Sequence, residues 1–167
     1  MSFVGGVGYS NIDLIYSGLE RLPEKGEEIF ARGFSMQFGG GIPATMINLS
    51  RLGVESRILT FAGDDLFSEF VKKTLEKYPV KTVNLYRGDK MPVVLSSTLL
   101  YGGDRSFISY TDGMDLNDAV MDEVYENLKG VSVVDMHVGF LDVYKRLKKD
   151  GCIQIFDTGW EDDLTLE

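Results

Sequence analysis

The sequence predicts an α/β protein, built on a mainly parallel sheet that carries helices and a smaller projecting β layer. From residue 57 onward, short apolar runs typical of buried strands alternate with segments whose apolar residues recur at three- and four-residue steps. Two β-rich segments, approximately residues 14–36 and 92–111, interrupt this alternation. We expect a single domain over residues 1–167 in which both segments meet as one β flap; the alternative is two ordinary surface hairpins.

The first part of the chain contains strand, loop and helix signals in turn. SFVGGVG predicts a strand that ends at glycine and leads into a loop carrying Asn11 and Asp13. GEEIFAR and GFSMQF predict short strands on either side of Gly33. Residues 43–52 predict a helix, because proline is tolerated in a first turn and the glycine at position 53 can end the helix. Residues 57–61 predict a buried strand.

The remaining elements follow from the same signals. Asp64 is expected to cap a second helix that carries an apolar stripe, with Asp65 in its first turn. Two β-rich runs around GGDR predict a hairpin. The other predicted elements are strands in VKTVNLY, VSVVDMHV and CIQIFD and helices over residues 117–129 and 140–149.

Composition excludes several classes of function. The formal net charge is −9 and the basic residues are scattered, which argues against a nucleic-acid partner. A single cysteine, Cys152, excludes an internal disulfide and leaves no zinc-ligand spacing. No apolar run is long enough to span a bilayer and the N-terminus lacks a secretory signal, so we expect a cytoplasmic protein without a membrane partner.

Two glycine-rich stretches raise the question of a nucleotide site. GGVGYS has no third glycine of a dinucleotide fingerprint, and Gly39–Gly41 lack the Lys-Ser/Thr ending of a P-loop. Glycines 39 to 41 can instead present backbone N–H groups at a helix N-terminus, opposite Asn11 and Asp13, whose oxygens suit the hydroxyl groups of a sugar. Alternatively, Asn11 and Asp13 cap a turn and the glycines permit helix–sheet contact. The spacing leaves both interpretations open.

The order of several segments resembles the PfkB (ribokinase-like) carbohydrate kinases. GGGIPATMINLSRLG followed by ILTFAGDDLFSEF matches the first signature of that family: a glycine pair, a helix, Leu-Gly, a strand and Gly-x-Asp. GYSNIDLIY is similar to the family's first strand and sugar-binding Asn-x-Asp loop. LPEKGEEIFARGFSMQFGGG and DRSFISYTDGMDL resemble its Pro-x-x-Gly-Glu strand and its returning lid strand. The resemblance covers most of the chain and implies a three-layer α/β/α fold with a β lid.

The resemblance implies phosphorylation of a sugar or nucleoside hydroxyl by ATP. ATP and Mg²⁺ are the cofactors expected of a full-length member, and we expect none of them to bind this chain alone. The expected assembly is a homodimer through the lid or an exposed sheet edge. Asp65 matches the Asp of Gly-x-Asp, although Ser68 stands where many members have glycine. With Gly41 added from the glycine run, the expected substrate-binding residues are Asn11, Asp13, Gly39, Gly40, Gly41, Leu99, Phe107 and Ser109.

Two departures from the family pattern limit this expectation. Ala44 occupies the place of the Asn that contacts the sugar, and Asn48, one turn further along, is a candidate replacement. The second signature, Asp-Thr-x-Gly-Ala-Gly-Asp, is absent, and FDTGWEDD does not replace it. We therefore expect the substrate-binding half of a sugar kinase, inactive as an isolated chain, with no catalytic residue or metal site of its own.

Two other classes of function stay open from the sequence. One is a non-catalytic fragment that acts through oligomerisation or sugar binding, since a sheet that ends at CIQIFD would expose an apolar edge. The other is an unrelated Rossmann-like domain that binds a nucleotide at Gly5–Gly8. His137, at the end of an apolar strand, is expected to be structural more often than catalytic, because no nucleophile is paired with it.

Overall fold

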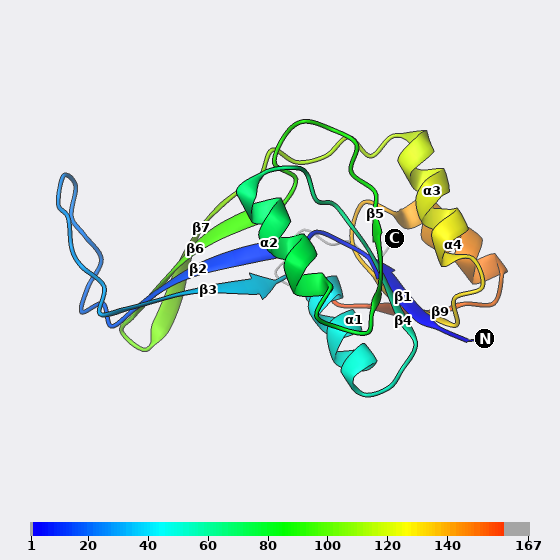
Figure 1. Cartoon of the computed structure of the whole chain (residues 1–167), viewed down its shortest axis with the longest axis horizontal. Coiled ribbons are helices and arrows are strands. Elements are labelled where there is room, and N and C mark those ends of the chain that lie inside the picture. Colours follow the sequence, from blue (N-terminus) through cyan, green and yellow to red (C-terminus); the bar gives the residue numbers. More distant parts are fainter. Residues whose placement is uncertain (1, 159–167) are drawn as a thin grey trace.

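The computed structural model describes residues 2–158, which form two separate sheets (Figure 1). The larger is a five-stranded parallel sheet in the order β5-β4-β1-β8-β9. Its strands are β1 (Val4–Val7), β4 (Ser56–Thr60), β5 (Lys81–Asn84), β8 (Val133–Met136) and β9 (Ile153–Phe156). The predicted α/β class with a parallel sheet is therefore confirmed.

Helices cover this sheet on both faces. Helices α1 (Gly41–Arg51) and α2 (Leu66–Leu75) lie on one side, and α3 (Asp118–Leu128) and α4 (Leu141–Lys149) on the other (Figure 1). The central strand β1 contains glycines because both layers approach it closely: a Cβ atom at Gly6 would lie 2.6 Å from Ile42 Cγ2 of α1, and one at Gly5 would lie 2.8 Å from Leu128 Cδ2 of α3. A dinucleotide-binding motif would need a helix directly after this strand, but β1 is followed by strand β2. Gly5 and Gly6 therefore allow the helices to pack closely on the sheet.

The smaller sheet has four strands in the order β3-β2-β6-β7 and projects from one side of the core (Figure 1). Its strands are β2 (Asn11–Ser17), β3 (Gly33–Gly39), β6 (Val94–Tyr101) and β7 (Asp104–Tyr110). β2 pairs in parallel with β6, while β2–β3 and β6–β7 are antiparallel, so the sheet is mixed. At its base, Ile12 and Val93 pack with α1 and α2 in a shared apolar core.

Three local predictions were wrong. Residues 27–32 of GEEIFAR form no strand, and the Phe30 side chain in this segment is 85% exposed, because the carboxylate of Glu27 instead holds a loop together through Arg21 and the Glu24 N–H. Asn11 and Asp13 lie in strand β2 rather than in a loop. The cap of α2 is Asp65 rather than Asp64.

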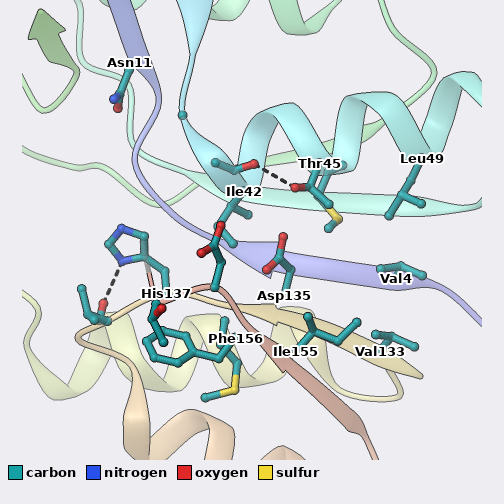
Figure 2. A pocket seen from close by; sticks show the side chains of 17 residues that line it. Val4, Asn11, Ile42, Thr45, Leu49, Val133, Asp135, His137, Ile155 and Phe156 are labelled. Atoms are coloured by element: carbon teal, nitrogen blue, oxygen red, sulfur yellow. Dashed lines mark hydrogen bonds between the residues drawn. The ribbon is translucent and has the colours of Figure 1, made fainter. Parts of the chain in front are cut away.

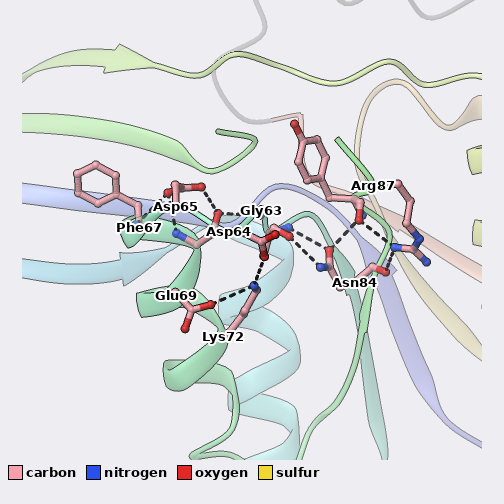
Figure 3. A network of polar contacts seen from close by, with 11 residues as sticks. Gly63, Asp64, Asp65, Phe67, Glu69, Lys72, Asn84 and Arg87 are labelled. Carbon is pink, nitrogen blue, oxygen red and sulfur yellow. Dashed lines mark hydrogen bonds and ion pairs between the residues drawn. The ribbon is translucent and has the colours of Figure 1, made fainter. Parts of the chain in front are cut away.

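The cap at Asp65 belongs to a local polar network (Figure 3). Its carboxylate accepts hydrogen bonds from the backbone N–H groups of Phe67 (2.9 Å) and Ser68 (3.0 Å) and from the Ser68 hydroxyl (2.5 Å). Ser68 in turn accepts a bond from the Gly63 N–H at 2.8 Å. Burial acts to raise the pKa of Asp65, but these hydrogen bonds outweigh it and lower the pKa below its ordinary value.

Replacing Asp65 by alanine is expected to lower the free energy of unfolding by about 1–2 kcal/mol at pH 7, because two N–H groups of α2 lose their acceptor. Since the pKa is lowered in the folded state, the stabilisation is present above the unfolded-state pKa of about 4 and is lost as the pH falls through the folded-state value. Urea denaturation from pH 7 to pH 2.5 measures this. Asp64→Ala is the control, because Asp64 is exposed and pairs with the Lys72 ammonium group at the surface. Equal losses in both variants would contradict the cap.

Candidate functional site

A hollow of about 770 Å³ lies where the carboxyl ends of β8 and β9 meet the N-terminus of α1 (Figure 2). Its polar side chains come from four different elements or the segments that follow them: Asn11, Thr45, Asp135, His137, Asp157 and Thr158. Apolar residues of the open sheet face continue its wall: Val4, Ile42, Met46, Leu49, Val133 and Ile155. Ligands of open α/β sheets bind at this edge, so the hollow is the candidate functional site.

The N-terminus of α1 supplies backbone donors to the hollow. Gly40 is the N-cap residue, and no side chain caps the helix. The Gly40 carbonyl accepts from the Ala44 N–H at 2.9 Å, as the first helical bond. The preceding N–H groups, of Gly41 and Ile42, have no acceptor within the helix, and Pro43 has no N–H. Gly40 and Gly41 line the hollow, so these donors are available to a hydroxyl or anionic oxygen of a ligand.

Asp13 lies beside this helix start, on one face of strand β2. It shares a row of the small sheet with Gln37 and Ser96. Gly39 makes room for its carboxylate, since a Cβ atom there would lie 2.9 Å from Asp13 Oδ2. Burial raises the pKa of Asp13 above its ordinary value. Asn11, two residues earlier, faces the same way and lines the hollow.

Strands β6 and β7 carry the other three residues expected to bind the substrate, Leu99, Phe107 and Ser109, and place them on different faces of the small sheet. Ser109 is paired with Ser96, and their hydroxyl oxygens are 2.8 Å apart. Phe107, two residues from Ser109, is therefore on the same face of the sheet as Asp13 and is 50% exposed. Leu99 is paired with Tyr16, which places its side chain on the opposite face. The structure thus brings Asn11, Asp13, Ser109 and Phe107 onto one face but not Leu99.

Asp135 and Thr45 reach the hollow although sequence reasoning assigned them no binding role. The Thr45 hydroxyl donates to the Gly41 carbonyl at 3.0 Å and is also within hydrogen-bond reach of the Asp135 carboxylate. Burial, with a contribution from the charge of Asp157, raises the pKa of Asp135, while Thr45 and His137 act in the opposite direction. The signal in the sequence was strand alternation: Val134 is buried under α4, so Asp135 must face the other side.

His137 is held in place by three contacts. Its backbone N–H donates to the Tyr144 hydroxyl at 2.9 Å, its Nδ1 lies 2.9 Å from the Val138 carbonyl oxygen, and its ring meets the Tyr9 ring edge-on with centroids 5.7 Å apart. Because a carbonyl only accepts, Nδ1 carries the proton and the Nε2 of a neutral ring is an acceptor. His137 therefore lines the hollow as a positioned polar group.

The proposed replacement of the missing Asn by Asn48 has no support in the geometry. Asn48 donates its side-chain amide to the Ala44 carbonyl at 3.0 Å and is not among the residues that line the hollow. Within residues 2–158, no group of three or more His, Cys, Asp or Glu side chains could hold a metal ion. No helix in this part of the chain is long and apolar enough to cross a membrane. The end of FDTGWEDD, from residue 159, lies outside the described residues.

Comparison with solved structures defines the class of protein first: the chain has a ribokinase-like α/β fold. Over 99% of its length it superposes on the ribokinase of Thermotoga maritima with a TM-score of 0.78 at 18% identity, covering 55% of that chain. The ribokinase of Arabidopsis thaliana, solved with ribose and ATP, gives a TM-score of 0.72 at 22% identity and covers 95% of this chain and 54% of that one.

The sequence then places the chain in a family. The pfkB family carbohydrate kinase pattern matches residues 1–158, so the chain belongs to this family. A protein of Pyrococcus horikoshii that carries the name sugar kinase PH1459 is 31% identical over 127 residues, which are 74% of this chain and 39% of that protein. The chain thus spans about half the length of the ribokinases it resembles and a smaller part of this relative.

Proposed function

We propose that this chain is the substrate-binding part of an ATP-dependent carbohydrate kinase and that a sugar or nucleoside binds in the hollow. The observation that carries the proposal is the position of the Asp13 carboxylate against Gly39, directly before the N-cap of α1, with Asn11 on the same face of β2 lining the hollow beside Gly40 and Gly41. A carboxylate accepts two hydroxyl protons and the N–H groups donate to hydroxyl oxygens, which is the complement of a vicinal diol. Membership in the PfkB family supports the same ligand class.

In this proposal each site residue has a defined part. Asn11 and Asp13 of β2 and Ser109 and Phe107 of β7 contact the ligand from one face of the small sheet, which acts as a lid, and the backbone of Gly39–Gly41 contacts it where β3 leads into α1. Ser96 joins this set through its contact with Ser109, and Leu99 leaves it because it faces away. The family uses ATP; we assign no residue of this chain to the nucleotide, to Mg²⁺ or to a catalytic base.

Replacing Asp13 by asparagine is expected to weaken binding of the sugar that binds best by about tenfold or more, because hydrogen bonds to a charged acceptor contribute about 1.5–3 kcal/mol each. Isothermal titration of the chain with a panel of pentoses, hexoses and nucleosides measures this. Asp89→Asn is the matched control, since Asp89 is exposed and outside the hollow. Absence of binding by the folded chain, or equal affinity in both variants, would contradict the proposal.

An activity assay tests separately whether this chain contains all the residues that phosphoryl transfer requires. The 167-residue chain is expected to release no ADP in a coupled assay with any sugar of the panel, because phosphoryl transfer requires a base and charge stabilisation around the γ-phosphate. Turnover by this chain alone would show that its own residues complete the active site.

A second candidate function, association between copies, is favoured by the outer face of the small sheet. Large apolar side chains gather on the face opposite Asp13: Tyr16, Phe34, Met36, Leu99, Ile108 and Tyr110. Ile108 is 70% exposed, and both edge strands of this sheet, β3 and β7, are unpaired on one side. We propose that two copies pack these faces together, because a contiguous exposed apolar patch favours burial against a partner.

Light scattering coupled to size-exclusion chromatography tests the association. Wild-type chain is expected to elute as a dimer and Ile108→Asp as a monomer. Phe30→Asp, in the loop between β2 and β3, is the control because it places the same charge on an exposed aromatic position outside the patch. A monomeric wild-type chain, or loss of the dimer in the control alone, would overturn this candidate.

A further inference from the structure

One face of the small sheet continues outward from the hollow. Asn11 lines the hollow, and Asp13 follows it on the same face of β2, which we call the Asp13 face. Strand pairing fixes the next row of side chains on this face, called here the second row: Ile15, Ser35, Thr98 and Phe107. Because alternate residues of a strand are about 7 Å apart, the second row lies one sugar ring's length beyond Asp13.

The Thr98 hydroxyl of the second row is buried without a hydrogen-bond partner. Thr98 is 5% exposed, and no group in the described part of the chain bonds to its Oγ1 atom. Ser96, two residues earlier on the same face, is equally buried, but its hydroxyl oxygen lies 2.8 Å from that of Ser109. An unpaired buried hydroxyl lowers stability, and valine in its place would avoid this loss. The hydroxyl of Thr98 therefore serves no hydrogen bond of the fold.

Phe107 controls access to this hydroxyl. It is paired directly with Thr98, and the Cβ atoms of such cross-strand pairs are about 5 Å apart. Phe107 is 50% exposed, and it lies on β7, an edge strand of the small sheet, so no further strand of this sheet confines its ring (Figure 1). Rotation of the ring away from Thr98 would give a ligand an aromatic surface and a hydroxyl partner together.

The chemistry of the second row suits a second sugar ring better than a nucleobase. A sugar ring presents C–H groups on its faces and hydroxyls at its rim, which match the Phe107 ring and the hydroxyls of Thr98 and Ser35. The edge of a nucleobase is recognised by groups that donate and accept side by side, such as the amides of Asn and Gln. The second row contains no amide, and Gln37 lies in the row of Asp13 instead.

We propose that the substrate of this site is a disaccharide, whose first ring binds at the hollow and whose second ring binds to Thr98, Ser35 and Phe107. The proposal rests on the proposed function, since it presumes that a sugar binds in the hollow. Thr98 is then a specificity-determining residue, because its hydroxyl bonds only to a ligand long enough to reach the second row.

Isothermal titration of the full chain at pH 7 compares maltose, cellobiose, lactose and sucrose with glucose, galactose and fructose. At least one disaccharide is expected to bind about tenfold or more tightly than its component sugars, the ratio that one added hydrogen bond and one aromatic contact provide. In Thr98→Val this preference should fall to about threefold or less, with monosaccharide affinity retained. Ser97→Ala is the matched control, since it removes a hydroxyl from the opposite face of the same strand and should keep the preference.

Stability separates a ligand-binding role of Thr98 from a structural one. Valine has nearly the same shape as threonine and removes the unpaired hydroxyl. Thr98→Val is therefore expected to raise the urea midpoint of the free chain while it weakens disaccharide binding. A lower midpoint would show that the hydroxyl has a partner in the fold and would overturn the inference.

The titrations distinguish failure of this inference from failure of the proposed function. Disaccharides that bind no more tightly than their component sugars, or a preference that survives in Thr98→Val, would overturn the disaccharide inference and leave sugar binding intact. Adenosine and ribose form a further arm: a preference for adenosine that is lost in Thr98→Val, without one for any disaccharide, would overturn it in favour of a nucleobase. Failure of every sugar and of adenosine to bind a chain whose thermal unfolding shows that it is folded would contradict both proposals.

Discussion

Replacing Phe61 by alanine is expected to lower the free energy of unfolding by about 3–5 kcal/mol, the cost of removing a large aromatic side chain from a closed core. Phe61 is fully buried at the end of β4. Its ring stacks on Phe140 with centroids 6.4 Å apart and meets Tyr9 at 5.4 Å. Truncation removes contacts with two other segments at once, since Tyr9 follows β1 and Phe140 is the N-cap residue of α4.

Urea denaturation with a fluorescence or circular dichroism readout measures this loss. Phe30→Ala is the matched control, since Phe30 is 85% exposed and its truncation should change the free energy of unfolding by no more than about 0.5 kcal/mol. Similar losses in the two variants would mean that Phe61 is not part of the core. Because Tyr9 also contacts His137, Phe61→Ala should weaken ligand binding in the hollow as well.

Replacing Gly40 by alanine is expected to cost about 2–3 kcal/mol of stability and to abolish measurable sugar binding. The backbone of Gly40 has φ of 105°, which side chains rarely adopt. A Cβ atom there would lie 2.5 Å from the Tyr9 carbonyl oxygen, so β1 and α1 would have to move apart. That movement would displace the donors of the α1 N-terminus from the ligand.

Gly41→Ala is the matched control for stability. Gly41 is helical, and a Cβ atom added to it meets no atom within 4 Å, so alanine should leave stability unchanged or raise it by up to about 1 kcal/mol. Thermal and urea denaturation compare the two variants, and titration with sugar measures binding for Gly40→Ala. A Gly40→Ala chain as stable as Gly41→Ala would contradict the strain assigned to this position.

The sequence supported the elements that carry strong local signals. The helices α1, α3 and α4 are within about two residues of their predicted bounds, because glycine or proline marks their ends and apolar residues repeat along one side. Every strand of the parallel sheet lies within or overlaps a segment that was predicted as a strand, although β5 contains a single apolar residue, Val83. The predictions for residues 27–32 and for the cap of α2 were wrong because both depend on which side chain accepts a hydrogen bond from a free backbone N–H group. The sequence cannot distinguish two adjacent acidic residues such as Asp64 and Asp65 as the acceptor.

The candidate site was only partly visible in the sequence. A binding role for Asn11, Asp13 and the glycines could be predicted because they occupy positions in a recognisable order of motifs. Asp135 could not be joined to Thr45, since they are far apart in the chain and meet only through the packing of α1 on the sheet. Leu99 was expected over the ligand together with Phe107 and Ser109, but the pairing of β6 with β2 puts it on the face opposite Asp13, and a shift of one residue would reverse this.

The α/β class and membership in the PfkB family were thus accessible from the order of residues, because periodicity and glycine positions are local properties of the chain. The composition of the hollow was not. It depends on the contact of α1 with β1 and on the side of β8 that faces α1. These are set by packing between segments distant in sequence, and they place an acidic side chain, Asp135, opposite the donors of the glycine-rich helix start.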